Sequence, residues 1–138
     1  MTAGIRDGLQ TLLAGEATIS ALVGSRVYYG YGPQKSATYP HIVLTLQGAY
    51  GFNNFDTTNK LRAVDFDIDC KAKRSVESET LGDAVRTFID DYTGLAGEQT
   101  ISAVLMNDEQ TDVEPAPDGS DVHVHNTLID VTIQFKPV

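Results

Sequence analysis

Cysteine is nearly absent from this sequence, because its 138 residues include a single one, Cys70. One cysteine cannot form a disulfide within the chain, and Cys70 is expected to be a small buried side chain. No apolar run approaches the ~18 residues of a membrane span. The N-terminus also lacks the basic and apolar regions of a secretory signal. The length predicts one domain, residues 1–138, that folds without crosslinks. We therefore expect a soluble, single-domain protein with no membrane partner.

Basic residues are also scarce, since 10 Lys and Arg stand against 19 Asp and Glu and give a formal net charge of −9. This balance argues against specific binding to nucleic-acid phosphates, because no net positive field is present to release counterions. The acid is concentrated in a stretch without Lys or Arg, Asn107 to Asp121, which contains Asp108, Glu109, Asp112, Glu114, Asp118 and Asp121. Its prolines and glycine favour a solvated acidic loop over an acidic docking site.

Three aspartates form the most regular polar pattern in the chain. The segment Leu61–Lys71 reads LRAVDFDIDCK, so Asp65, Asp67 and Asp69 alternate with apolar residues at the two-residue period of a β-strand. The three carboxylates should share one face, as a metal site, a catalytic pair or a wet surface. At ~7 Å from one to the next along a strand, they are too far apart for one small cation to bridge all three. A wet strand face is the simplest interpretation.

Motifs for catalysis and metal binding are missing. The sequence has neither a GxSxG nucleophile elbow nor a GxxxxGK[ST] phosphate loop. His123 and His125 could offer two imidazoles, but zinc needs three or four ligands and Cys70 is expected to face the core. His41 follows Pro40 at the start of an expected strand, where a surface role suffices. We expect no enzyme, no metal site and no cofactor.

Periodicity gives the fold class. Helical spacing begins at Thr2 and stops at Gly15, a short turn follows at Thr18–Val23, and a longer helix begins near Ser75 and ends at Gly94. Strands are expected at Ile42–Leu46, Leu61–Lys71, Thr100–Met106 and Val122–Phe135. This order predicts an α+β fold. Its largely antiparallel sheet has four strands or slightly more, with an N-terminal helical segment and one long helix packed on one face.

A long polar loop separates two of the expected strands. The stretch Tyr50–Lys60 reads YGFNNFDTTNK and carries two aromatic side chains. Its central residues are Phe52, Asn53, Asn54, Phe55 and Asp56. Exposed aromatics in a polar loop are typical of interfaces, so this is a candidate partner-docking loop. The alternative is that both phenylalanines tuck back onto the domain.

Several segments resemble one family of small tailed-bacteriophage proteins. The stretch from Ala21, ALVGSRVYYGYGPQKSATYPHIVL, resembles the family's opening: a short helix ending in LVG, an RVY step, a Gly/Pro loop and a proline before an apolar strand. The segment LRAVDFDIDCKAKRSVESETLGDAVRTFID is similar to its second strand and following helix, and NDEQTDVE takes the place of an acidic loop. The family is that of tail-completion proteins, also called tail-terminator or head-tail joining proteins.

The resemblance implies a structural virion protein at the head-tail junction, assembled in the host cytoplasm. Proteins of this family form a ring, usually of six subunits, that closes the head-proximal end of the tail tube. The implied partners are other copies of the chain, the tail tube protein and a head-tail connector or adaptor protein. Genomic DNA passes through without specific binding.

The ring gives the aspartates two possible roles. On the lumen, Asp65, Asp67 and Asp69 of six copies would place ~18 carboxylates around DNA, which they repel within a Debye length of ~8 Å. In a ring contact, they would pair with basic residues of a neighbouring subunit, for which the candidates are Lys60, Arg62 and Lys73.

Two other classes of protein stay open. An acidic, monomeric binding or inhibitor module could occupy a basic partner surface, and the acid of Asn107–Asp121 favours it. A metal-dependent hydrolase using the aspartates and histidines is the weaker alternative.

Overall fold

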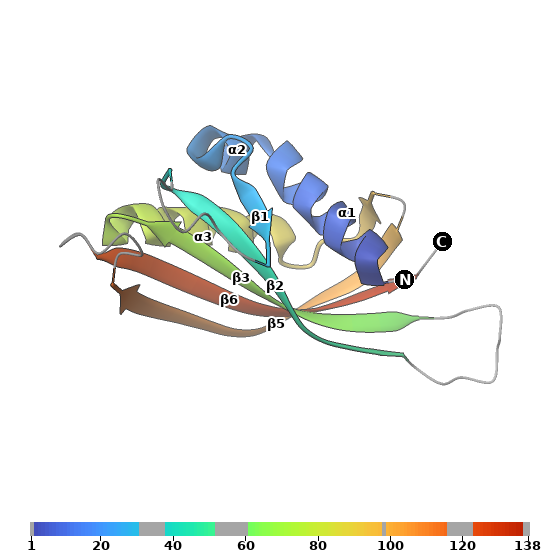
Figure 1. The fold of residues 1–138 in the computed structure, drawn as a ribbon. Helices are drawn as coiled ribbons and strands as arrows, with labels where there is room; N and C mark the ends of the chain where they lie inside the picture. The colour runs from blue at the N-terminus through green and yellow to red at the C-terminus, as the bar shows by residue number, and fades with distance from the viewer. Residues whose placement is uncertain (1, 31–37, 52–60, 98, 116–122, 137–138) are drawn as a thin grey trace.

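The computed structural model of the chain describes residues 2–30, 38–51, 61–97, 99–115 and 123–136, which form a curled sheet with helices on one side (Figure 1). The described helices are α1 (Thr2–Gly15), α2 (Ala17–Val23) and α3 (Ser75–Ile89). The described strands are β1 (Val27–Tyr29), β2 (His41–Gly51), β3 (Arg62–Ala72), β4 (Gly94–Ala96), β5 (Gln99–Glu114) and β6 (Val124–Lys136). None of these helices is long and apolar enough to cross a membrane.

The described strands make one six-stranded sheet in the order β1-β2-β3-β6-β5-β4. β1 runs parallel to β2, and each other neighbouring pair is antiparallel. The three helices cover the same face of this sheet, which leaves the opposite face free of them (Figure 1). The central strands β3 and β6 therefore have one dry face and one wet face.

The predicted fold class is wrong. In place of a four-stranded, largely antiparallel sheet with one long helix, the described residues form a mostly β structure with a six-stranded mixed sheet and three short helices. The added strands β1 and β4 have three residues each, which is too few for a periodic pattern. The helix expected to reach Gly94 ends at Ile89, because Asp90 takes an extended conformation with φ −61° and ψ 125°.

The acidic stretch is a strand over most of its length, so the prediction of a loop is also wrong there. β5 continues through Asp108, Glu109 and Asp112 to Glu114, and it pairs with β6 as far as Glu114 opposite Val124. The loop was predicted from charge and proline content, but pairing with the apolar strand β6 overrides composition. Asp118 and Asp121 lie outside the described residues.

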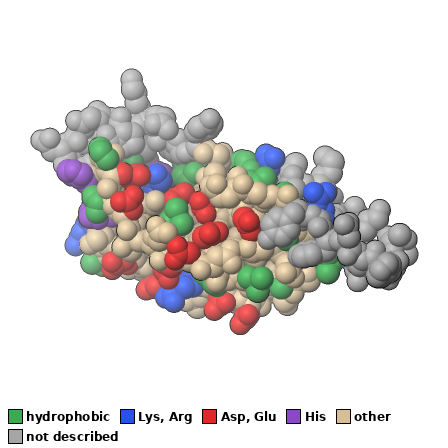
Figure 2. Space-filling view, turned by 90° about the horizontal axis from the view of Figure 1, so that it is seen from below, with side chains coloured by type: hydrophobic (Ala, Val, Ile, Leu, Met, Phe, Trp, Pro, Cys, Tyr) green, Lys and Arg blue, Asp and Glu red, His purple; other side chains and the backbone are tan. Residues whose placement is uncertain are grey.

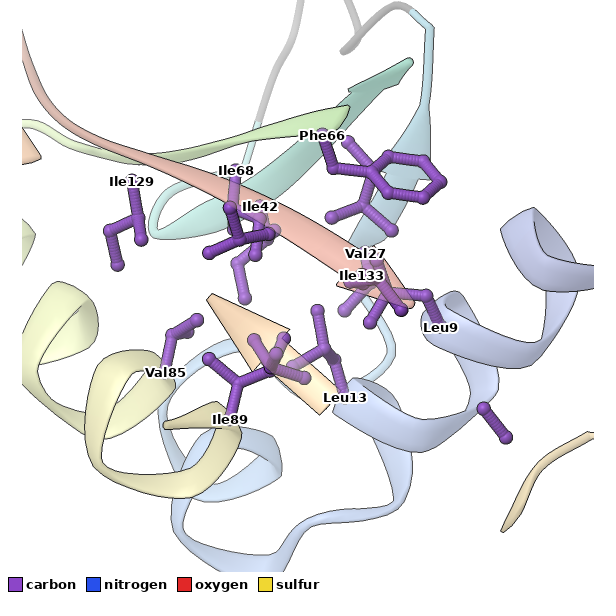
Figure 3. Packing of buried hydrophobic residues seen from close by; sticks show 14 of the residues in the cluster. Leu9, Leu13, Val27, Ile42, Phe66, Ile68, Val85, Ile89, Ile129 and Ile133 are labelled. Atoms are coloured by element: carbon purple, nitrogen blue, oxygen red, sulfur yellow. The ribbon is translucent and has the colours of Figure 1, made fainter. Parts of the chain in front are cut away.

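Apolar side chains of the helices and the central strands form one core (Figure 3). Its labelled members come from α1, β1, β2, β3, α3 and β6: Leu9, Leu13, Val27, Ile42, Phe66, Ile68, Val85, Ile89, Ile129 and Ile133. The alternation predicted for β3 is confirmed, since Phe66, Ile68 and Cys70 are buried and the aspartates between them are half-buried. The predicted first helix, from Thr2 to Gly15, is confirmed as well.

α1 approaches the sheet most closely at Gly8. A Cβ at this position would overlap the backbone carbonyl of Ala96 in β4. The residue after β4 is also close to α1, because Gly97 has φ 63° and a Cβ there would lie 3.2 Å from the Gly8 Cα. Gly15, at the C-terminal end of the same helix, has no such neighbour within 4 Å. Glycine at position 8 therefore sets the distance between α1 and β4.

We predict different effects for the same substitution in the middle of α1 and at its C-terminal end. Gly8→Ala should lower the free energy of unfolding by about 1–3 kcal/mol, because the backbone of β4 must shift to admit the methyl group. Gly15→Ala should leave stability unchanged or raise it by up to about 1 kcal/mol, since alanine favours helix and meets open space. Urea unfolding followed by circular dichroism measures both, and equal midpoints for the two variants would contradict the close packing.

Candidate functional site

The sheet face turned away from the helices is rich in carboxylates, and we call it the acidic face. Alternation along the paired strands β3, β6 and β5 assigns seven acids to it: Asp65, Asp67, Asp69, Asp108, Asp112, Glu114 and Asp130. Figure 2 shows this side of the molecule, with Asp and Glu side chains gathered across its centre. The structure therefore confirms that the three predicted aspartates share one face, and it adds four acids from β5 and β6.

Neutral donors hold the carboxylates of β3 in place. The Thr132 hydroxyl donates to Asp65 Oδ1 at 2.6 Å and accepts from Asn107 Nδ2 at 2.7 Å. Asn126 Nδ2 donates to Asp69 Oδ1 at 2.7 Å. Gln47 Nε2 donates to Asp67 Oδ2 at 2.9 Å. Since amides and hydroxyls carry no charge, these bonds fix the carboxylates without neutralising them.

Like charges face one another across the strands. Asp67 is directly opposite Asp130 in β6, and Asp130 is directly opposite Asp108 in β5. Burial raises the pKa of the Asp67 carboxyl, and the charges of Asp130 and Asp69 raise it further. Like charges placed directly opposite destabilise a sheet. The row Asp67-Asp130-Asp108 therefore costs stability, which is typical of a surface kept for function.

A basic side chain contacts the acidic face at one end of it. Lys71 Nζ lies 2.6 Å from Glu114 Oε1, and both side chains are partly buried. Within the described ranges, no salt bridge joins Asp65, Asp67 or Asp69 to a basic residue. The centre of the face therefore keeps its negative charge.

The predicted basic partners of the aspartates do not meet them within the subunit. Arg62 is opposite the core residue Phe135, on the helix side of the sheet, and its buried Nε has no hydrogen-bond partner among the described residues. Lys73 is exposed, and its Nζ lies 5.8 Å from the centroid of the Tyr39 ring. Lys60 lies outside the described residues, as do Phe52, Asn53, Asn54, Phe55 and Asp56 of the candidate docking loop.

The described side chains do not assemble a metal centre. No group of three or more His, Cys, Asp or Glu among them is placed to hold an ion. His123 is exposed just before β6, His125 is half-buried within it, and Cys70 is fully buried. Burial also raises the pKa of the Cys70 thiol, so it stays protonated and unreactive.

The sequence suggested a surface role for His41, but the residue is buried and only 2% exposed. Its ring centroid lies 5.5 Å from that of Tyr28 and 4.8 Å from that of Tyr39. Burial lowers the pKa of its imidazole. A buried, neutral ring packed on two aromatics is part of the structure of β2 rather than an acid-base group.

Sequence reasoning missed the acids and the neutral donors that complete the face. Asp130 and Asp108 join Asp67 only through the register of three strands, and Asn126 and Thr132 come from β6 in the same way. The available signal was the alternation of Asp130 and Thr132 with the apolar residues of β6. Alternation within a strand does not determine the register, that is, which residues of two neighbouring strands lie opposite each other.

Comparison with solved structures defines the class of fold. The chain resembles one described as "Virion of native gene transfer agent (GTA) particle", with a TM-score of 0.61 and 14% sequence identity. The likeness covers 99% of this chain and 95% of that chain, so the whole fold is shared. No curated protein matches the sequence.

A family model identifies the chain more narrowly. The model described as Tail completion protein gp17 matches residues 7–131. The chain belongs to this family, as its resemblance predicted. Membership of a family of tail completion proteins gives the chain a structural role in a virion.

We predict that Asp67→Asn stabilises the isolated domain by roughly 0.5 kcal/mol at neutral pH, because it removes a charge that faces Asp130. The asparagine oxygen can still accept from Gln47. Because the folded-state pKa of Asp67 is raised, its carboxylate opposes folding at neutral pH, and the gain should disappear as pH falls and Asp67 is protonated. Urea unfolding at neutral and acid pH measures this. The control is Asp7→Asn, at an exposed position of α1, for which we expect no change in stability. A loss of stability in Asp67→Asn would contradict the repulsion.

Proposed function

We propose that this chain forms a ring of six copies that ends the tail tube and joins it to the head connector. Genomic DNA passes through the ring without specific binding. The proposal rests on membership of the tail completion family. The partners are other copies of the chain, the tail tube protein and a connector or adaptor protein, and the place is the head-tail junction of the virion.

The acidic face is the observation that supports a role beside DNA. Its central carboxylates keep their charge and their orientation, although the row Asp67-Asp130-Asp108 costs stability. Turned toward the lumen in six copies, Asp65, Asp67 and Asp69 alone supply ~18 carboxylates, whose field repels a polyanion within a Debye length of ~8 Å. Such a wall keeps passing DNA from adhering.

The placement of the basic candidates makes the ring-contact role of the aspartates less favourable. Arg62 is directed to the helix side of the sheet, away from the acidic face. Lys73 is exposed and could reach a neighbouring subunit. The neutral donors Thr132, Asn126 and Gln47 already occupy oxygens of the three carboxylates. We therefore assign the aspartates to the lumen rather than to the contact between subunits.

The acidic-module alternative makes a different prediction for the free protein. A monomeric inhibitor would remain a monomer at every concentration and would bind a basic partner with strong salt dependence. A tail-completion ring assembles, either alone or on the tail. Light scattering with negative-stain imaging of the purified chain separates the two.

We predict that the triple variant Asp65→Asn, Asp67→Asn, Asp69→Asn still forms rings, and that particles carrying it deliver DNA several-fold more slowly. The substitutions keep an oxygen acceptor for each neutral donor but remove the repulsion that keeps DNA off the wall. Ring formation is measured by light scattering, and delivery by DNA release from purified particles at low and high salt.

The control removes three charges elsewhere, through Asp7→Asn, Asp90→Asn and Asp91→Asn, all exposed and away from the acidic face. It should leave assembly and delivery unchanged. If the triple variant of β3 assembles and delivers as the wild type does, the lumen role is wrong. If it fails to assemble while its fold is intact, the aspartates belong to a subunit contact instead.

A further inference from the structure

Among the described residues, two strands near the margins of the sheet have an outer neighbour over only part of their length. Within these residues, β4 pairs with β5 at Gln99–Ile101 and β1 pairs with β2 at Ile42–Leu44. No described strand pairs with the outer edge of β5 beyond Ile101, or with the outer edge of β2 from Leu46 onward. Long unpaired edges offer backbone donors and acceptors to another strand.

The two open edges lie at the same level of the sheet. Gly48 of β2 is opposite Asp65, Asp65 is opposite Thr132, and Thr132 is opposite Leu105 of β5. One row of cross-strand partners therefore runs from the open edge of β2 to the open edge of β5.

The edges also differ in charge and polarity. β2 reads HIVLTLQGAYG and contains no Asp, Glu, Lys or Arg. The open edge of β5 begins with the uncharged run Ser102–Met106 and becomes acidic from Asp108 onward. Leu105 in that run is 48% exposed and shares the acidic face with Thr132 and Asp65, at an edge where no described strand lies beside it. Its burial against an uncharged strand is favourable.

Strand direction favours contact between the two unlike edges. Three antiparallel steps separate β2 from β5, so the two strands run in opposite directions. Rotation about an axis close to the strand direction leaves each strand's direction unchanged. It therefore brings β5 of one subunit antiparallel to β2 of the next and keeps every acidic face on the same side. Contact between unlike edges is heterologous, the type that closes into rings.

We propose that the Ser102–Met106 edge of β5 in one subunit pairs antiparallel with the Leu46–Gly51 edge of β2 in a second copy of the chain. This inference rests on the proposed ring and names the surfaces that close it. The pairing covers Leu105 and joins neighbouring sheets edge to edge.

The acids of β5 and the bulges define the limits of this contact. Two β5 strands paired with each other would oppose Asp108, Asp112 and Glu114 to like charges, which disfavours a two-fold dimer through that edge. Register shifts between Ile101 and Ala103, between Met106 and Asp108, and between Leu46 and Gly48 lie at or near the ends of the two proposed segments. Bulges commonly end pairing at sheet margins.

Paired cysteines test the contact directly. We predict that Gly48→Cys with Leu105→Cys in one chain gives a ladder of disulfide-linked species beyond the dimer under mild oxidation. Facing residues of an antiparallel pair have Cα atoms about 4.5–5.5 Å apart, within reach of a disulfide. Gly48 accepts a side chain, since the nearest atom to its Cβ is Asp65 Oδ2 at 3.9 Å. A second double variant, Gly48→Cys with Ala103→Cys, tests the pairing in which β5 is shifted by two residues relative to β2.

Each single-cysteine variant is the matched control and should give no ladder. Dimers from Leu105→Cys alone would show contact between like β5 edges and overturn the proposal. Absence of a ladder from both double variants in assembled rings would also overturn it. The native Cys70 is fully buried and stays out of the exchange.

A charge at the edge gives a second measurement without cysteine chemistry. Leu105→Glu should weaken ring assembly at least tenfold, because the β2 strand of the next subunit would remove water from the added carboxylate. Val76→Glu on α3 places the same charge at another exposed apolar position, 62% exposed, and should assemble normally. Equal assembly of the two variants would contradict the edge contact.

Failure of the ring and failure of this contact give different results. If the wild-type chain stays monomeric both in solution and in particles, the proposed ring is wrong. If the wild-type chain forms rings but neither double-cysteine variant crosslinks and Leu105→Glu assembles normally, the ring stands and only the edge contact is wrong.

Discussion

The antiparallel pairing of β3 with β6 is the constraint on which the rest of the structure depends. Its register is unbroken from Arg62 opposite Phe135 to Ala72 opposite His125, whereas the flanking pairs contain bulges. Because side chains alternate, a slip of one residue would turn Phe66 to water and Asp67 to the core. This one pairing therefore fixes the apolar surface that α1 and α3 cover and the carboxylate surface on the other side.

Local patterns predicted the parts of the fold whose information is local. The alternation in β3 and the stripe of α1 each lie within one segment, so the buried face of β3 and the bounds of α1 followed from sequence. β1 and β4 are too short to have a period. The first half of β5 was predicted as the strand Thr100–Met106, but its continuation to Glu114 was hidden by its acidic, proline-flanked composition. Asp130 and Asp108 could not be joined to Asp67 from sequence, because their proximity depends on register between distant strands.

The two faces of the sheet divide stability and function between them. The helix-covered face supplies the burial that stabilises the domain, with Phe66, Ile68, Ile129 and Ile133 fully buried. The opposite face carries like charges that oppose folding, and burial together with the charges of Asp130 and Asp69 raises the pKa of Asp67. The function of a structural protein in a virion depends on what its surfaces attract and repel.

The Thr132 hydroxyl has a consequence for how the acidic face behaves in a crowded particle. It accepts a hydrogen bond from Asn107 Nδ2 and donates one to Asp65 Oδ1, so a line of hydrogen bonds from β5 through β6 to β3 holds the aspartate. A salt bridge would lose strength as ions accumulate, and it would cancel the charge that it holds. A chain of neutral groups does neither. These hydrogen bonds therefore hold the Asp65 carboxylate in place even in the concentrated salt that surrounds densely packed DNA.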